Sequence, residues 1–224
     1  MFIGHYAVAL AAKKATPKTS LGVLFIAAQF LDLLWPALIV FGIERVRLSP
    51  DVNPMLQLDF VSYPYSHSLV GALLWAVGFG GMAYLFRRNI REAFVLAGCV
   101  VSHWVLDYFT HIPDLPITFT GDTKVGLGLW NSVVGTMIVE TALFAGGIIV
   151  YVRCTHAKDR IGVYAFWTLM VLLFLVYMAS VFGPPPTDAT QVGLLANLAW
   201  VFVVWAWWAD RHRAGTEVEV GGMQ

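Results

Sequence analysis

The sequence predicts an all-α protein, a polytopic membrane helix bundle with about six spanning helices and a short N-terminal half-helix. Hydrophobic residues make up 58% of the 224 residues and charged residues only 12%, whereas a soluble domain carries about a quarter charged residues. The mean hydropathy is +0.71. The apolar residues gather in runs of ~20, the length that crosses the hydrocarbon core of a bilayer. We therefore expect an integral membrane protein in contact with the lipid bilayer.

Six apolar runs are long enough to cross a membrane. Polar, charged or proline-containing segments separate them. The spanning helices are expected at residues 20–43, 67–86, 93–112, 132–152, 161–182 and 190–209. We expect residues 1–210 to form one transmembrane domain. The remaining residues, 211–224, are polar with several glycines and are expected to form a flexible cytoplasmic tail.

The lysines and arginines predict the orientation of these helices. Eleven of the 14 basic residues fall on one side of the expected topology, and basic loops of membrane proteins face the cytoplasm. Both termini are therefore expected to be cytoplasmic, in a bacterial inner membrane, with the loops at 44–66, 113–131 and 184–189 facing outward. The net charge is zero and no basic patch is interleaved with aromatic residues, so we expect no nucleic-acid partner.

Several ionisable side chains lie within the expected spans. Such residues are costly in a membrane, and the default interpretation is a functional one. The expected topology brings all of them to the outer half of the membrane, although depth played no part in counting the basic residues. They are Asp32 in the first span, His67 at the start of the second, His103, Asp107 and His111 in the third, and Glu140 in the fourth.

The third span carries the most informative motif. His103, Asp107 and His111 are spaced i, i+4, i+8, so a continuous helix would project all three from one face. The two histidines would then be ~12 Å apart along the axis, too far to bind one ion. Two ions with Asp107 between them, or one ion shared by two of the three residues, are both open. Imidazole and carboxylate ligands together suit zinc, or manganese or iron.

The N-terminal segment, residues 2–14, is too short to span the membrane. It could lie flat on the cytoplasmic surface. It could instead be a half-span helix that turns into the first span at Thr16-Pro17. Eight residues of helix would then place His5 ~12 Å above Lys13, level with Asp32. In that arrangement Met1 would also be buried near the site.

Each of these residues has a structural alternative. A lone buried histidine in a helix bundle more often forms hydrogen bonds within the core, which applies to His5. Ser66 could cap the helix that His67 begins, and Glu140 could pair with a buried donor. The third-span residues together with Asp32 favour a functional site, because several ionisable groups at one depth are hard to explain by packing alone.

These residues resemble a known family. An early histidine, an aspartate on the first span, His67-Ser68 and the His-x-x-x-Asp helix from His103 to Asp107 resemble the membrane-bound metal-dependent hydrolase family. Their order is similar to that in the soluble zinc-dependent phospholipase C and nuclease superfamily. Those all-helical enzymes cleave phosphoesters with a metal-activated water, using up to three zinc ions, and their N-terminal residue ligates a metal.

The resemblance covers roughly residues 1–140 and implies a full set of metal ligands. Two positions depart from the pattern. Thr136 stands where soluble members have a histidine, and Phe30-Leu31-Asp32 lacks the Pro-Asp-x-Asp sequence of the membrane family. We therefore expect two zinc ions, with three as the upper limit. The implied ligands are His5, Asp32, His67, His103, Asp107, His111 and Glu140.

The resulting expectation is a membrane-embedded hydrolase of a phosphoester or lipid-like, amphiphilic substrate near the outer leaflet. Asp107, or Asp32 if it bridges no ions, would orient the attacking water or act as base, and Glu140 would complete the catalytic set. Lys124 and Asn131, in the loop that borders the site, would bind the substrate, although a solvated lysine is an equal alternative for Lys124.

Two other functions stay open. The first is a transporter or channel for divalent metal ions or protons, since buried histidines and aspartates also mark ion paths. Against it, the ionisable residues gather at one depth, and the sequence has no repeated halves or paired broken helices. The second is a non-catalytic membrane protein with a structural metal. The sequence does not predict an oligomeric state.

Overall fold

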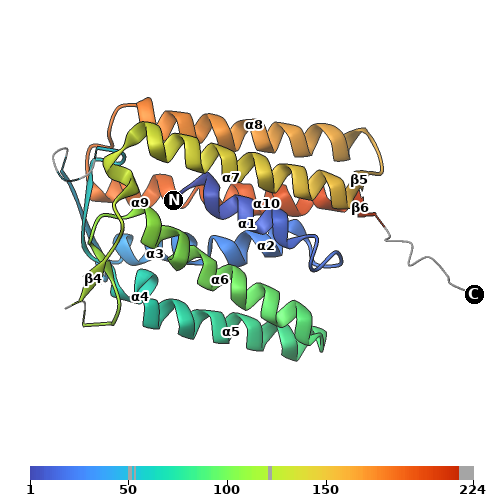
Figure 1. Ribbon diagram of the computed structural model, residues 1–224, viewed down its shortest axis with the longest axis horizontal. Coiled ribbons are helices and arrows are strands. Elements are labelled where there is room, and N and C mark those ends of the chain that lie inside the picture. The colour runs from blue at the N-terminus through green and yellow to red at the C-terminus, as the bar shows by residue number, and fades with distance from the viewer. Residues whose placement is uncertain (50–51, 53, 121–122, 217–224) are drawn as a thin grey trace, which may run out of the picture.

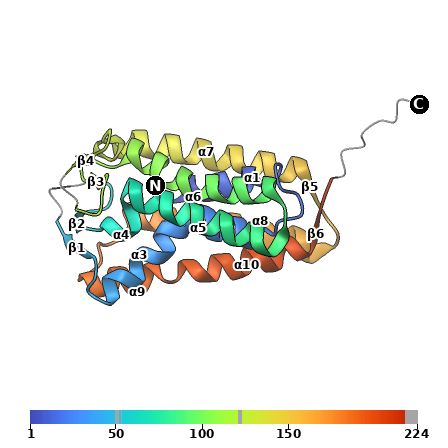
Figure 2. The ribbon, with the colours of Figure 1, turned by 90° about the horizontal axis from the view of Figure 1, so that it is seen from below.

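The computed structural model describes residues 1–49, 52, 54–120 and 123–216. Its long helices lie side by side in an elongated bundle, with small two-stranded sheets at the two ends (Figure 1). The view turned by 90° shows the same arrangement of long helices, with β1 to β4 at one end and β5 and β6 at the other (Figure 2).

Five segments are long and apolar enough to cross a membrane: α5 (Leu69–Arg87), α6 (Ile90–Thr110), α7 (Val133–Cys154), α8 (Arg160–Phe182), and the pair α9 (Ala189–Ala196) and α10 (Ala199–Arg211) taken as one. A bent pair, α2 (Leu21–Ala28) and α3 (Phe30–Val40), brings the number to six if the pair is counted as one span. Large apolar side chains cover the outside of the bundle, as at Val77, Phe86 and Val134. The expected all-α bundle is confirmed, and the chain is a helical membrane protein.

The first span is not the continuous helix expected over residues 20–43. It breaks at Gln29, and its two halves are bent by 60°. The break is not at Pro36, which lies inside α3. The run of apolar residues gave no sign of the break, because hydropathy reports the environment of a segment and not its direction. The bend turns the carbonyl of Ala28 toward α6, where it accepts a hydrogen bond from His103.

The N-terminal segment forms α1 (Ile3–Ala12), a short helix inside the bundle. Ile3, Ala9 and Leu10 are completely buried, so the half-span alternative is correct and the surface alternative is wrong. Helix α1 packs most closely against α7. A β-carbon at Gly147 would lie 2.6 Å from the carbonyl oxygen of Ala7, and glycine is therefore required for this approach.

One end of the bundle carries most of the irregular structure. Strands β1 (Arg45–Leu48) and β2 (Leu58–Ser62) pair antiparallel and lead into the single turn α4 (Pro64–His67). Strands β3 (Leu115–Pro116) and β4 (Lys124–Val125) pair in the same way, and the 3-10 turn η1 (Leu129–Asn131) precedes α7. Phe60 and Trp130 from these segments are buried, so the loops close this end of the bundle.

The opposite end corrects the expected flexible tail. Strand β6 (Arg213–Gly215) pairs with β5 (Thr155–Ala157). Arg213 is buried, donates to the carbonyl of Gly162 at 2.9 Å, and lies over the rings of Tyr151 and Phe166. Residues 211–216 are therefore held in place by a cationic side chain packed on aromatic rings, and residues 217–224 lie outside the described part of the chain.

Asp210 joins its own helix, α10, to three other helices at this end. Its carboxylate accepts hydrogen bonds from Lys13 Nζ at 2.6 Å, from Tyr151 Oη at 2.6 Å and from the backbone amide of Leu21 at 3.0 Å. Asp210 and Lys13 are both buried. The carboxylate therefore ties the C-terminal end of α1 to α2, α7 and α10.

We expect Asp210→Ala to destabilise the protein by about 3–5 kcal/mol, because it leaves the buried ammonium group of Lys13 without its partner. Thermal unfolding of the detergent-solubilised protein measures the loss. His212→Ala is the control, since it removes the exposed ion pair of His212 with Asp159, and exposed pairs contribute little. Equal losses in the two variants would contradict the role assigned to Asp210.

Candidate metal centre

Four ligand-type atoms from three segments face one another inside the bundle. His67 Nε2, on α4, lies 3.3 Å from Asp32 Oδ1 and 3.9 Å from Asp107 Oδ2. His103 Nε2, on α6, lies 3.6 Å from Asp32 Oδ1 and 3.2 Å from Asp107 Oδ2. Ligands at ~2 Å from one tetrahedral ion are ~3.3 Å apart. The ligand atoms of Asp32, His67 and His103 therefore lie close enough together for a single cation, and Asp107 Oδ2 lies beside both histidines.

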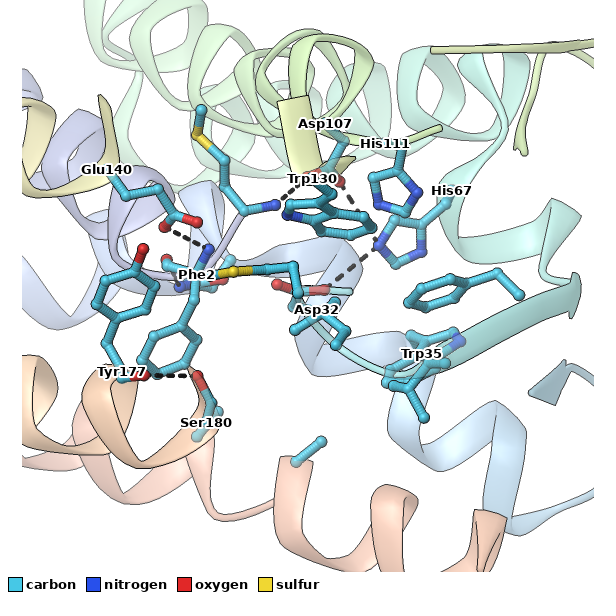
Figure 3. Close-up of a pocket in the computed structure, with 18 of the residues that line it drawn as sticks. Phe2, Asp32, Trp35, His67, Asp107, His111, Trp130, Glu140, Tyr177 and Ser180 are labelled. Atoms are coloured by element: carbon cyan, nitrogen blue, oxygen red, sulfur yellow. Dashed lines mark hydrogen bonds and ion pairs between the residues drawn. The ribbon is translucent and has the colours of Figure 1, made fainter. Parts of the chain in front are cut away.

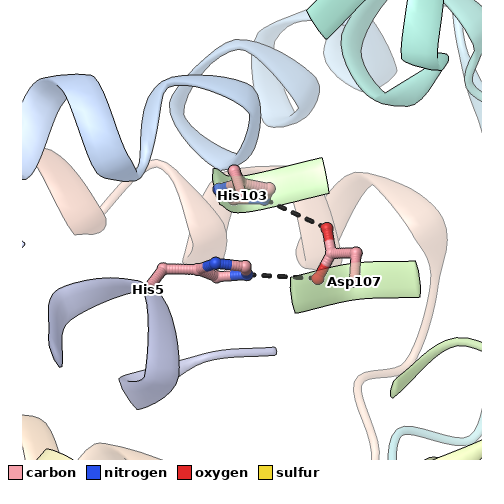
Figure 4. A group of neighbouring side chains, drawn as sticks. All are labelled: His5, His103 and Asp107. Atoms are coloured by element: carbon pink, nitrogen blue, oxygen red, sulfur yellow. Dashed lines mark hydrogen bonds and ion pairs between the residues drawn. The ribbon is translucent and has the colours of Figure 1, made fainter. Parts of the chain in front are cut away.

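The second carboxylate oxygen of Asp107 faces the other way. Asp107 Oδ1 accepts a hydrogen bond from the amino group of Met1 at 2.6 Å and lies 3.1 Å from His5 Nε2. Figure 4 shows His5 and His103 approaching different oxygens of this carboxylate. The two imidazole rings stack with their centroids 3.6 Å apart. Asp107 therefore lies between His5, on α1, and the ligand atoms of Asp32 and His67, on α3 and α4. The two groups of ligand atoms are His5, His103 and Asp107, and Asp32, His67 and His103.

The hydrogen bonds of His103 test whether a cation fits. Its Nδ1 must carry the proton, because its 2.8 Å partner is the carbonyl oxygen of Ala28, which can only accept. In the neutral imidazole, His103 Nε2 then carries a lone pair, and among the described residues it has no hydrogen-bond partner, although it is fully buried beside two carboxylates. An unsatisfied buried nitrogen among carboxylates is costly, and a shared cation would satisfy all three groups.

His67 is oriented by a relay that the sequence did not suggest. Glu44 Oε2 accepts from the hydroxyl of Ser66 at 2.6 Å, and Glu44 Oε1 accepts from the amides of Tyr65 and Ser66. Because the hydroxyl proton goes to Glu44, Ser66 Oγ accepts from His67 Nδ1 at 2.7 Å. His67 Nε2 is therefore left as a lone pair facing Asp32. Such outer partners commonly fix the tautomer of a metal-binding histidine.

Ser66 does not cap the helix after His67, which was the structural alternative for this residue. The helix that follows is capped by Ser68, whose hydroxyl accepts from the amide of Gly71 at 3.0 Å. Ser66 instead links Glu44 to His67. Glu44 is almost completely buried, but its position in a segment expected to be an outward loop carried no signal of burial.

His111 does not share the helix face of His103 and Asp107. Helix α6 ends at Thr110, and His111 has an extended backbone with ψ of 145°, as expected for a chain approaching Pro113. Its Nδ1 lies 2.8 Å from Asp114 Oδ1, and the centroid of its ring lies 4.0 Å from the ring centroid of Trp130. His111 belongs to neither group of ligand atoms, so the i, i+8 argument failed where the helix ended.

Glu140 is buried but also lies outside both groups. Its Oε2 accepts hydrogen bonds from the amides of Phe2 at 2.8 Å and Gly4 at 3.2 Å. These amides belong to the first turn of α1, where backbone donors have no partner within the helix. Glu140, on α7, therefore holds the start of α1, and with it His5, in place against α7. Its expected catalytic role stays a prediction.

Asp32, His67 and Asp107 lie at one side of a cavity of about 240 Å³. Figure 3 shows these three residues with His111 and Trp130 on one side and Tyr177 and Ser180 on the other. Lys124 and Asn131 do not line this cavity and are exposed. The wall residues missed by sequence reasoning include the aromatic side chains of Phe2, Trp35, Phe60, Trp130 and Tyr177.

Comparison of the chain with protein-family models, curated proteins and solved structures finds no match. The resemblance to metal-dependent hydrolases therefore depends on the short motifs quoted above, and the function is argued from the site itself.

We expect Ser66→Ala and Glu44→Gln each to weaken zinc binding by about 10- to 100-fold, because loss of an outer hydrogen bond frees the tautomer and ring of a ligating histidine. Zinc titration against a competing chelator measures the change. Ser102→Ala is the control, since the Ser102 hydroxyl only donates to the carbonyl of Cys99 on its own helix. Unchanged affinity in both relay variants would show that His67 binds no metal.

Proposed function

We propose that this chain is a membrane-embedded metal-dependent hydrolase that cleaves a phosphoester or lipid-like substrate. One observation carries the proposal. Asp32, His67, His103 and Asp107 bring four ligand atoms together with pair distances of 3.2, 3.3, 3.6 and 3.9 Å, and three of these residues line a cavity. A buried cluster of this kind in a membrane bundle supports metal chemistry on a substrate held in the cavity.

The ligand set favours zinc. His67 and His103 with Asp32 would hold one ion, and His5 with Asp107 would hold a second. A bound divalent cation lowers the pKa of a coordinated water and polarises a phosphoryl oxygen. Three acidic residues at the site, Asp32, Asp107 and Glu140, face one ammonium group, that of Met1, and this excess of carboxylates favours cation binding.

Asp32 is the best placed of the four to handle protons. Its side chain is 31% exposed, whereas that of Asp107 is 2% exposed and has close partners on both oxygens. Asp32 would orient the attacking water and accept its proton as the water oxygen bonds to phosphorus. The bond from phosphorus to the leaving oxygen breaks, and the proton passes to that oxygen. Water and phosphoester thus yield an alcohol and a phosphate.

The basic residues support an orientation with the site toward the outer leaflet of a bacterial inner membrane. The turn after α1, the α5–α6 turn and strands β5 and β6 lie at one end of the bundle (Figure 1), and these segments carry most of the lysines and arginines. By the positive-inside rule this end is cytoplasmic. The cavity then lies in the outer half of the membrane.

The interior between the cluster and the basic end argues against ion transport. Along α1 from His5 to Lys13, Ala9 and Leu10 are completely buried, as are Leu24 and Phe25 on the adjacent α2. No chain of ionisable groups on these helices leads from one end to the other in the described residues. An ion path requires polar or water-filled passage through the bundle, which these apolar side chains do not offer.

Metal content is the first test. Elemental analysis of purified wild type incubated with zinc should give about two ions per chain, and the double variant His103→Ala/Asp107→Ala should lose them, because His103 belongs to both groups of ligand atoms and Asp107 to one of them. His156→Ala, in strand β5 at the other end, is the control. Failure of the wild type to retain zinc or manganese would overturn the proposal.

Hydrolysis is the second test. Zinc-loaded protein in liposomes should release alcohol and phosphate from phosphoester lipids, as measured by mass spectrometry. We expect Asp32→Asn to lower the rate by about 10²- to 10⁴-fold, the usual contribution of a general base. If zinc-loaded wild type cleaves neither phosphoester nor carboxylic ester lipids, the cluster has a binding role only.

A further inference from the structure

The cavity beside the cluster changes character along its length. At one side it meets the ionisable groups of Asp32, His67 and Asp107. Away from them the wall holds one further carboxylate, that of Glu140, which accepts from the amide of Phe2. The rest of this side is apolar: the rings of Phe2 and Tyr177, whose centroids lie 6.4 Å apart, and the small side chains at the junction of α9 and α10. A ligand that matches this cavity therefore has a polar group at one end and a hydrocarbon part at the other.

The apolar side of the cavity reaches the surface of the bundle beside Ser180. Ser180 is exposed and also lines the cavity. Its hydroxyl donates to the carbonyl of Tyr177 at 2.7 Å on the same helix, so the hydroxyl proton is already engaged and Ser180 presents little polarity to the cavity. Figure 3 shows Ser180 and Tyr177 on one helix, across the cavity from Asp107 and His67.

The break between α9 and α10 forms the other side of this opening. Helix α9 packs against α3, whereas α10 packs against α2 and α8. Ala196 and Ala199 flank the break, line the cavity and are partly exposed. Around them, Phe182, Leu195 and Leu198 are 71%, 55% and 57% exposed. Large exposed apolar side chains on a spanning helix face hydrocarbon, so the opening leads into the bilayer.

We propose that this part of the cavity binds the hydrocarbon chain of an amphiphilic phosphoester, which enters sideways from the bilayer between α8 and the α9–α10 break. The polar headgroup then lies against Asp32 and His67. The assignment of the headgroup rests on the proposed function, whereas the chain-binding site rests on the cavity alone. The small side chains of Ala196 and Ala199 keep the entrance open, and a bulky side chain at either position would block it.

Photochemical labelling tests the site without requiring turnover. The probe is a lysophosphatidylcholine with a diazirine in its acyl chain, incorporated in liposomes with the zinc-loaded full chain. After irradiation, peptide mass spectrometry should locate label in residues 177–180 and 196–199. We expect Ala199→Trp to reduce label in residues 177–180 at least fivefold and Ala199→Leu to reduce it less. Val171→Trp, at an exposed position of α8 outside the cavity, should leave it unchanged.

Folding and function are separated by two measurements. Ala199→Trp should keep the zinc content and the thermal stability of the wild type, which shows that it blocks the entrance and does not unfold the bundle. Asp32→Asn, which lacks the proposed base, should still be labelled. Label confined to lipid-facing positions and insensitive to Ala199→Trp would overturn the chain-binding site, even if the protein hydrolyses phosphoesters. Specific labelling without hydrolysis would support this site and overturn the proposed function instead.

Discussion

The buried carboxylate of Asp107 is the constraint on which the arrangement of the site depends. A charge inside a membrane bundle requires close partners, and Asp107 finds them on both sides. One oxygen contacts the amino group of Met1 and His5, and the other faces His67 and His103. The short helix α1 is therefore drawn into the bundle, where Glu140 holds its first turn and Gly147 allows α7 to approach it.

The neighbouring irregularities all serve to orient the histidines. The break at Gln29 brings the carbonyl of Ala28 to His103, and Glu44 directs the hydroxyl of Ser66 so that it accepts from His67. In both cases the hydrogen bond to Nδ1 leaves Nε2 facing carboxylates. A straight first span would have kept the Ala28 carbonyl bonded within its own helix. The bend therefore frees this carbonyl for the hydrogen bond that fixes the tautomer of His103.

The bundle divides its buried polar groups between two ends with different consequences. At the basic end, Asp210, Lys13 and Tyr151 satisfy one another, so this network stabilises the packing of α1, α7 and α10. At the other end, His103 Nε2 lacks a hydrogen-bond partner among the described residues, and the cluster borders a cavity. Buried polar groups that hydrogen-bond to one another suit a structural role. Buried polar groups that lack a partner beside a cavity suit ligand binding.

Composition and apolar run length were enough to predict the membrane class and the helical bundle, because burial in a bilayer constrains every residue of a segment. The i, i+4 spacing was enough to place His103 beside Asp107. Only the tertiary structure decided that the first span bends at Gln29, that His111 turns away to Asp114, that Glu140 holds α1, and that Glu44 orients His67. Glu140 and Glu44 act through hydrogen bonds between segments distant in the chain, and the bend at Gln29 and the end of α6 at Thr110 are changes of backbone direction. None of these features leaves a local periodicity in the sequence.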